Sequence, residues 1–283
     1  MSKPSPNLIV ISDTHCGCKL GLCCPEGAEL DDGGTYMPSK MQLKAWAWWD
    51  EFWNEWVPKV TRGEPWDIVV NGDALDGVHH NSTTQISHNL EDQTNLAVRI
   101  LAPIVQKAAH YYHIRGTEAH VGQSGLEEER LAKRLGAIPD DEGKFARWEL
   151  WKRVGKDSKK NPAPLCHILH HIGTTGRAAY ETSAVQAELI AEFTEAGQNC
   201  ETPPDYAVRS HRHRYIKALN PSLRSEAAGI VTPGWQLKTP FVWKITGGRV
   251  SQPQVGGILI RQGDEEFYSR HFVKKLTRTR VEE

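Results

Sequence analysis

The chain has 283 residues and a formal net charge of −1. This length is sufficient for one large domain with a full buried core. The near-zero net charge excludes a global electrostatic field that attracts nucleic acid, so any polyanion has to bind locally. The first apolar run, Leu8 to Ile11, is too short for a signal peptide or a membrane span. We therefore expect a cytoplasmic protein with no membrane contact.

Apolar runs that alternate with helical periodicity predict an α/β protein. The strand-like segments are 8–12, 66–71, 111–115, 148–154, 165–169 and 206–209. The helical segments are 42–60, 92–109, 126–135 and 182–196. Without a clear linker or repeat, we predict a single domain over residues 1–283.

Two regions are expected to elaborate this domain. The helical segment at about 42–60 is rich in tryptophan and is predicted to end near Pro58. Its aromatic side chains are expected to pack in the core, and stacking of some of them on a substrate ring is the alternative. Near the C-terminus, Gly247-Gly248 and Gly256-Gly257 separate β-branched stretches and predict antiparallel hairpins at about 228–276.

Four short patterns of Asp and His directly follow apolar runs. They are Asp13-Thr14-His15, Gly72-Asp73, His170-His171 and His211-Arg212-His213. Open α/β sheets bind ligands at the carboxyl ends of their strands, where loops from distant parts of the sequence converge. Carboxylate oxygens and imidazole nitrogens that meet there are typical ligands of divalent transition metals. The sequence therefore predicts a metal site at this edge.

The spacing of these residues suggests how they share two cations. Asp13 and His15 are two apart in an extended segment, so their side chains lie on one side and can bind one cation. The same argument applies to His211 and His213. Asp73 is the predicted bridging carboxylate, because the preceding glycine allows a tight turn that leaves the carboxylate exposed at the strand end.

The sequence does not choose between His170 and His171. Adjacent residues of a strand face opposite ways, so one of the two is expected to bind metal. The other is expected to orient a neighbour or to contact substrate. We slightly favour His170 as the ligand.

The order of the motifs resembles the calcineurin-like metallophosphoesterases. The resemblance covers residues 8 to about 215 and rests on Asp13-x-His15, Gly72-Asp73-x-x-Asp76, a turn at Gly116, a strand-terminal His and His211-x-His213. It implies a four-layer α/β/β/α sandwich in which the C-terminal hairpins supply part of the second sheet. The implied ligands of the first metal are Asp13, His15, Asp73 and His213. Those of the second are Asp73, a residue of the Gly116 turn, His170 or His171, and His211.

The turn Gly116-Thr117-Glu118-Ala119-His120 departs from the family pattern of Gly-Asn-His followed by an acidic residue. In strict register Thr117 replaces the Asn ligand with a weaker hydroxyl, and Glu118 replaces the catalytic His. In a shifted register Glu118 supplies a carboxylate oxygen to the metal and His120 is the general acid. We favour the shifted register, whereas the strict one implies impaired acid catalysis.

The ligand types and the resemblance together predict a divalent-metal-dependent phosphoesterase, in which a metal-activated water attacks phosphorus. Mixed Asp and His ligation suits Mn²⁺, Fe, Zn²⁺ or Ni²⁺ better than Mg²⁺ or Ca²⁺, and Mn²⁺ is our first choice. A phosphodiesterase or nuclease is slightly favoured over a phosphomonoesterase. The alternative is a catalytically impaired metal-binding scaffold or interaction protein on the same fold.

Three residues near the motifs are candidates for contact with a substrate phosphate, namely His79, His80 and Arg115. A solvated loop and a surface ion pair explain them equally well. A basic stretch near the C-terminus is a candidate contact for a nucleic acid substrate, although such runs are usually solvated. It comprises Arg270, Lys274, Lys275, Arg278 and Arg280.

Four of the six cysteines, Cys16, Cys18, Cys23 and Cys24, crowd one loop. Their spacing is not a regular zinc-binding spacing, and a disulfide framework is not expected in a protein without a secretory signal. We predict reduced thiols near the entrance to the site. A structural zinc is the less favoured alternative.

Overall fold

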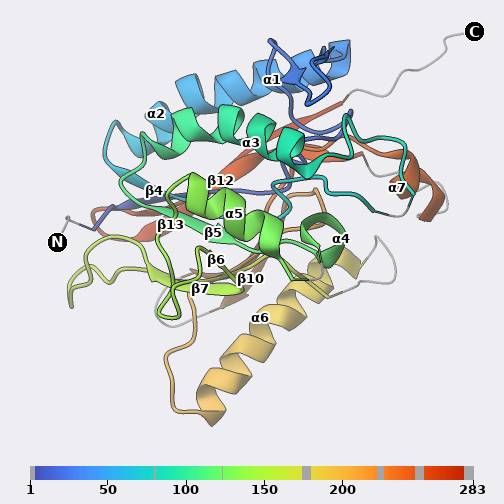
Figure 1. Ribbon diagram of the computed structural model, residues 1–283. Coiled ribbons are helices and arrows are strands. Elements are labelled where there is room, and N and C mark those ends of the chain that lie inside the picture. Colours follow the sequence, from blue (N-terminus) through green and yellow to red (C-terminus); the bar gives the residue numbers. More distant parts are fainter. Residues whose placement is uncertain are drawn as a thin grey trace, which may run out of the picture.

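The computed structural model describes residues 4–79, 81–122, 124–173, 180–221, 226–245 and 252–276. Strands and helices alternate around two main sheets, which confirms the predicted mixed α/β class (Figure 1). No helix in these ranges is long and apolar enough to cross a membrane.

The first sheet has six strands in the order β13-β12-β1-β4-β5-β6. Their bounds are β1 Asn7–Ile11, β4 Trp66–Asn71, β5 Tyr111–Ile114, β6 Ala146–Arg147, β12 Gln254–Gln262 and β13 Phe267–Lys275. Strands β1, β4, β5 and β6 are parallel, and β12 joins β1 antiparallel. The apolar residues of β1 are fully buried, as expected for a parallel strand that is covered on both faces.

The second sheet has five strands in the order β10-β11-β9-β8-β7. Their bounds are β7 Glu149–Arg153, β8 Leu165–Leu169, β9 Tyr206–Arg209, β10 Ile216–Pro221 and β11 Glu226–Val231. Strands β8, β9 and β11 are parallel, whereas β7 and β10 pair antiparallel at the edges. Leu8 and Val10 of the first sheet share one buried apolar cluster with Ile168, Val208 and Ile230 of the second. The two sheets therefore pack face to face.

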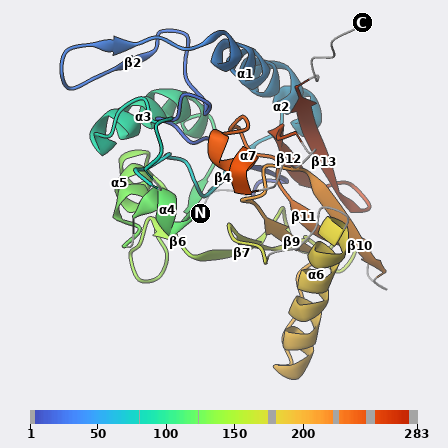
Figure 2. The same ribbon diagram turned by 90° about the vertical axis from the view of Figure 1, so that its right-hand side faces the viewer.

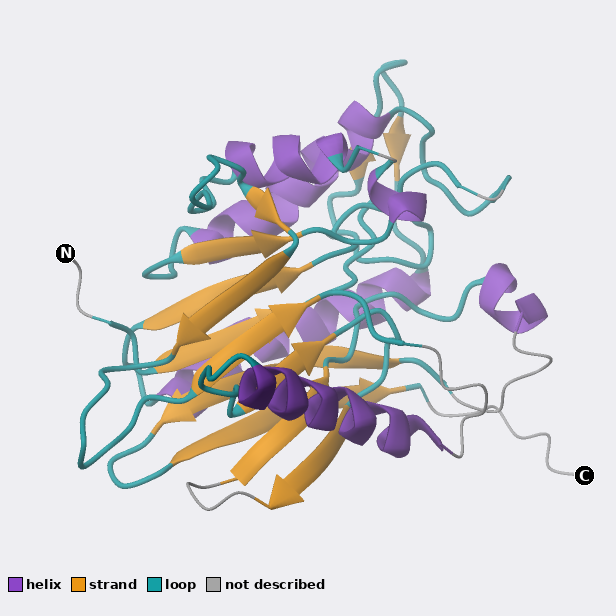
Figure 3. Ribbon diagram, turned by 90° about the horizontal axis from the view of Figure 1, so that it is seen from below, coloured by secondary structure: helices purple, strands orange, loops and turns teal. Residues whose placement is uncertain are grey.

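Helices cover the outer faces of both sheets. One apolar cluster joins Ile9 of β1 to residues of α1 (Lys40–Glu51), α3 (Leu90–Val105) and α5 (Leu126–Arg134). Helix α6 (Glu181–Gln198) packs on β10, β11 and β9 at the opposite side of the molecule, and in Figure 3 it lies in front of the strands. The short elements are β2 Ala28–Glu29, β3 Thr35–Tyr36, α4 Glu118–Val121 and α7 Pro240–Ile245.

The tryptophan-rich helical segment extends past the predicted end at Pro58. Helix α1 continues through a π-helical turn, Phe52–Trp56, into α2 (Val57–Thr61). The N–H of Val57 donates to the carbonyl of Phe52, five residues earlier. This wider turn accommodates Pro58, which has no N–H and clashes with regular α-helical spacing. Trp49 is buried in the core, as expected from the sequence.

The prediction that the C-terminal hairpins extend the second sheet is wrong for the last of them. Strands β12 and β13 pair with each other, and β12 pairs with β1 in the first sheet. Gly256 and Gly257 lie inside β12 rather than in a turn. Glycine is needed at these positions because neighbouring groups lie too close for a side chain. A Cβ on Gly256 would overlap the carbonyl oxygen of Phe272. Gly247 and Gly248 lie outside the described residues.

The crowded cysteines lie in the core and not at an entrance, which corrects that prediction. Cys16, Cys18, Cys23 and Cys24 are at most 2% exposed. Burial raises the pKa of the Cys16, Cys18 and Cys23 thiols to about 12. These side chains therefore act as small apolar groups in the packing.

We predict that one thiol reacts readily with Ellman's reagent in the native protein. Cys200 is the exposed cysteine, whereas the other five are buried. The measurement is the number of thiols that react at pH 8, with the urea-unfolded protein as the reference for all six. Cys200→Ser should abolish the rapid reaction, and rapid labelling of that variant would contradict this packing.

Candidate metal centre

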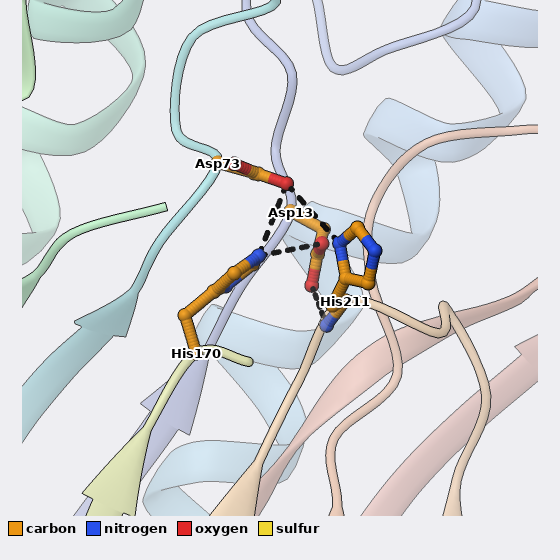
Figure 4. A group of neighbouring side chains, drawn as sticks. All are labelled: Asp13, Asp73, His170 and His211. Carbon is orange, nitrogen blue, oxygen red and sulfur yellow. Dashed lines mark hydrogen bonds and ion pairs between the residues drawn. The ribbon is translucent and has the colours of Figure 1, made fainter. Parts of the chain in front are cut away.

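The four motif segments meet at the edge where parallel strands of both sheets end. Asp13 follows β1, Asp73 follows β4, His170 follows β8 and His211 follows β9. Figure 4 shows these four side chains pointing toward one another. In Figure 2 the same edge faces the viewer, with α4 and α7 beside it. The convergence inferred from strand-end positions is therefore present in the fold.

The first group of potential ligands combines Asp13, Asp73, His170 and His211, whose ligand atoms all lie within 4.8 Å of one another. His170 Nε2 lies 3.0 Å from Asp73 Oδ2 and 4.0 Å from Asp13 Oδ1. His170 Nδ1 is 2.6 Å from the carbonyl oxygen of Asn71. Since a carbonyl only accepts, Nδ1 carries a proton and Nε2 is the atom that faces the carboxylates.

The second group consists of Asp13, His15 and His213. His213 Nε2 lies 3.2 Å from Asp13 Oδ1 and 3.3 Å from His15 Nε2. Asp13 thus belongs to both groups, whereas Asp73, the predicted bridge, belongs to one. Asp13 Oδ1 is one of the buried side-chain atoms of the described residues that have no hydrogen-bond partner. An unpartnered carboxylate oxygen where the two ligand groups meet suits coordination of a divalent transition cation.

Backbone strain is concentrated at the same residues. Eight non-glycine residues in the described part of the chain have positive φ, and five of them belong to these two groups. They are Asp13, His15, Asp73, His211 and His213, with φ between 41° and 71°. This left-handed backbone is unfavourable for residues with a side chain, and it clusters at functional sites when surrounding packing enforces it.

The carboxylates and imidazoles form buried ion pairs. Burial opposes ionisation of Asp13, but His213 and His170 hold its pKa well below the usual value. Asp73 is affected in the same way, mainly by His170. Burial alone lowers the pKa of His170, yet Asp73 raises it to about 10. A bound cation would take the place of these imidazole protons, because a histidine ligand has to be neutral.

A third group, formed by His15, Asp76 and His120, supports the first two. His15 Nδ1 lies 3.3 Å from Asp76 Oδ1, and His120 Nδ1 lies 2.6 Å from the Asp76 carbonyl oxygen. The side-chain amides of Gln85 and Gln236 donate to the two Asp76 carboxylate oxygens. Asp76 therefore orients both imidazoles by their Nδ1 atoms and leaves their Nε2 atoms free for the cluster. The sequence offered no signal for the two glutamines.

His120 lies beside the cluster, on the turn that departs from the family pattern. Its Nε2 is 4.0 Å from Asp73 Oδ2, and its ring contacts the ring of His15 edge to face at 4.4 Å. Burial, with a contribution from His15, lowers the pKa of His120 to about 4 against the opposing effect of Asp73. The imidazole is therefore neutral at pH 7, with its lone pair on Nε2.

The other residues of this turn differ in their relation to the cluster. The backbone N–H of Thr117 donates to Asp73 Oδ1 at 2.7 Å, and its hydroxyl lies 3.1 Å from the same oxygen. Glu118 begins α4, is exposed and belongs to none of the three groups. A Cβ on Gly116 would overlap Asp73 Oδ1 and the Asp73 backbone nitrogen. The glycine therefore allows the turn to pack against the carboxylate.

His171 lies next to the first group without joining it. Its side chain is exposed, and its ring centroid is 5.3 Å from that of His170 and 6.1 Å from that of His211. Burial and the two neighbouring imidazoles lower its pKa. The structure thus brings His170 rather than His171 among the potential ligand atoms.

The candidate phosphate-contacting residues occupy different places. His79 Nε2 lies 3.6 Å from Asp76 Oδ2, at the border of the cluster, whereas His80 lies outside the described residues. The Arg115 guanidinium donates to the carbonyl of Ala146 at 2.7 Å and lies over the ring of Trp148. Of these three candidates, His79 is the one that contacts a residue of the cluster, namely Asp76.

Within the described residues, the basic C-terminal stretch and the cysteine cluster show no part in this site. Lys274 pairs with Glu51 at 2.7 Å, and Arg278 and Arg280 lie outside the described residues. None of the potential metal-binding groups within the described ranges contains a cysteine. The structure therefore offers no support for a zinc module at Cys16 to Cys24.

Comparisons with known proteins find no match by sequence, and the structural matches include three of low identity. No protein-family model and no curated protein matches the sequence. Vacuolar protein sorting 29 from Cryptosporidium parvum is 7% identical, with a TM-score of 0.37 over 97% of this chain and 100% of its own. A Thermotoga maritima protein solved by NMR is 10% identical, with a TM-score of 0.36 over 95% and 99%. The sulfate thiohydrolase SoxB from Termus thermophilus, in complex with glycerol, is 10% identical, with a TM-score of 0.39 over 97% of this chain and 57% of its own.

We predict that Gly116→Ala destabilises the fold by about 1 to 3 kcal/mol, because the new methyl group overlaps Asp73. The measurement is the free energy of unfolding from urea titration. Gly197→Ala is the matched control, since its Cβ would meet nothing within 4 Å in helix α6. That change should be neutral or stabilising by about 0.5 to 1 kcal/mol. Equal stability of the Gly116 variant and wild type would contradict the close approach.

Proposed function

We propose that residues 1–283 form a single-domain, divalent-metal-dependent phosphoesterase with a four-layer α/β/β/α fold of the calcineurin-like metallophosphoesterase type. The main support is the convergence of two Asp and four His side chains at one strand edge, five of these six residues having left-handed backbone. The order of the motifs along the sequence is the second support. The proposed ligands are Asp13, His15, Asp73, His170, His211 and His213.

The donor set favours transition metals over Mg²⁺ or Ca²⁺, because imidazole nitrogens accompany the carboxylates. We propose two cations, with Mn²⁺ as the first choice and Fe, Zn²⁺ or Ni²⁺ as alternatives. Asp13, His15 and His213 would hold one, and Asp73, His170 and His211 the other, with Asp13 close enough to contribute to both. Bound there, the cations would supply Lewis acidity toward the phosphate and lower the pKa of a coordinated water.

The protein groups around the ligands would orient the ligand side chains and protonate the leaving group. The Asn71 carbonyl fixes the tautomer of His170, and Thr117 holds the Asp73 carboxylate through its N–H and hydroxyl. His120 is fixed at Nδ1 by Asp76, so Nε2 is the atom available to substrate. An anionic phosphate at that atom would raise the pKa of His120, which could then donate a proton to the leaving oxygen.

One observation favours the alternative of a metal-binding scaffold with impaired catalysis. Thr117 stands where the family has an Asn ligand, and its hydroxyl is engaged with Asp73. A site that lacks this ligand could bind cations and hydrolyse nothing. The two proposals therefore differ in turnover and agree in metal binding.

The test of the proposed function is a substrate panel assayed with added Mn²⁺. It compares chromogenic phosphodiesters and phosphomonoesters, cyclic nucleotides, and single- and double-stranded DNA and RNA. We expect turnover of at least one phosphodiester. Binding of Mn²⁺ without hydrolysis of any substrate would favour the scaffold, and the absence of both would overturn the metal site itself.

We predict that Asp73→Asn lowers turnover by more than about 100-fold, because even residues that only orient metal ligands contribute 10- to 100-fold. The measurement is kcat/KM with Mn²⁺ on the best substrate of the panel. Asp141→Asn is the matched control, since Asp141 is exposed and belongs to none of the potential ligand groups. Full activity of the Asp73 variant would refute the enzyme assignment.

We predict that His120→Gln lowers kcat by about 10²- to 10⁴-fold on substrates with a poor leaving group, the range of general acid catalysis. A nitrophenyl ester should lose less, because its leaving oxygen needs no proton. The dissociation constant for Mn²⁺ should remain unchanged, and His271→Gln on strand β13 is the control. Equal losses on both substrates, or weaker Mn²⁺ binding, would indicate a role in metal binding instead.

A further inference from the structure

Two site turns are tied together from behind by one buried carboxylate, that of Glu128 in the first turn of α5. Its Oε1 accepts the backbone N–H of Ala74 at 2.9 Å, and its Oε2 accepts the backbone N–H of Gly116 at 2.6 Å. Ala74 follows Asp73, and Gly116 precedes Thr117. Asp73 and Thr117 are joined by a hydrogen bond from the Thr117 N–H to the Asp73 carboxylate. The Glu128 side chain therefore binds the backbone next to each of these two residues.

The surroundings of Glu128 show a carboxylate that is built into the interior. Its exposed fraction is 0%, as is that of His113, whose Nε2 lies 3.6 Å from Glu128 Oε1. The hydroxyl of Tyr111 lies 2.6 Å from His113 Nδ1 and holds that ring in place. Burying a carboxylate is unfavourable unless its oxygens accept hydrogen bonds, and here both do. The two N–H groups would otherwise be buried donors without a partner.

These contacts control where Asp73 can lie. Asp73 has left-handed backbone with φ of 50°, a conformation that surrounding contacts have to enforce. Gly116 packs directly against its carboxylate and its backbone nitrogen. A shift of either turn would therefore move Asp73 relative to His170 and weaken the geometry of the ligand group.

We propose that Glu128 is a positioning residue for the metal centre, which holds the turns of Asp73 and Thr117 at the spacing that metal binding requires. This role rests on the proposed metal-binding function of the cluster. Glu128 belongs to none of the potential ligand groups, so it acts through the backbone of the turns and not by coordination.

The neighbouring residue provides a matched control. The two oxygens of Glu129 accept the backbone N–H groups of Phe145 and Ala146 at 3.0 and 2.8 Å. Glu129 thus makes the same kind of double contact from the same helix, at strand β6 instead of at the site. Glu128→Gln and Glu129→Gln each replace one accepting oxygen with an amide that donates, so each loses one such contact.

The experiment measures the dissociation constant for Mn²⁺ by titration calorimetry, together with the thermal unfolding midpoint of each metal-free protein. Glu128→Gln should weaken Mn²⁺ binding by at least about tenfold, as is typical for residues that orient metal ligands. Glu129→Gln should bind Mn²⁺ as the wild type does, even where its unfolding midpoint is lower. Equal Mn²⁺ affinity of Glu128→Gln and wild type would overturn the proposal, as would equal weakening in both variants.

A measurement on the wild-type protein keeps the test decisive if Glu128→Gln does not fold. The amide protons of Ala74 and Gly116 should exchange slowly with solvent in NMR spectra, because the Glu128 carboxylate accepts both. Fast exchange of either amide would overturn the proposal. Mn²⁺ binding without phosphoester turnover would defeat only the proposed catalytic function, whereas a wild-type protein that binds no Mn²⁺ would defeat both.

Discussion

The ion pair between Asp73 and His170 is the interaction on which the rest of the site depends. Asp73 follows β4 of the first sheet, and His170 follows β8 of the second. Their contact at 3.0 Å, buried on both sides, joins the carboxyl edges of the two sheets at one point. Because breaking a buried pair leaves an uncompensated charge, the sheets cannot slide apart at this edge without a large cost in stability.

Much of this arrangement could be predicted from the sequence because it follows from local rules. A continuous buried run such as Leu8 to Ile11 predicts a parallel strand, and the polar residues that closely follow it lie at the carboxyl edge of the sheet. Asp13 and Asp73 are predicted in this way, as is the pair His170 and His171, of which one is expected to bind metal. The position of a residue after a strand predicts that it lies at the carboxyl edge of the sheet. The repetition of Asp and His at such positions then indicates a candidate metal site at this edge.

The remaining features depend on contacts between distant parts of the chain, which no local pattern encodes. Gln236 lies 160 residues from the Asp76 carboxylate to which it donates. Glu128 stands in an acidic run at a helix N-terminus, a pattern typical of an exposed helix start, yet its side chain is fully buried. The register of Thr117, Glu118 and His120 was ambiguous because the turn becomes a one-turn helix, which exposes Glu118 and brings His120 beside Asp73.

The strained backbone and the buried charges of the site have a common physical cause. A residue in left-handed conformation at the end of a strand reverses the chain sharply, so its side chain can point across the sheet edge instead of along the strand. This geometry brings Asp13, Asp73 and His213 into one small volume, where like charges of the two carboxylates repel and imidazole protons compensate them. The rigid cores on either side hold that arrangement before any cation binds. Binding a divalent cation would then require proton release but little backbone rearrangement, so the strain located here serves preorganisation of the ligands.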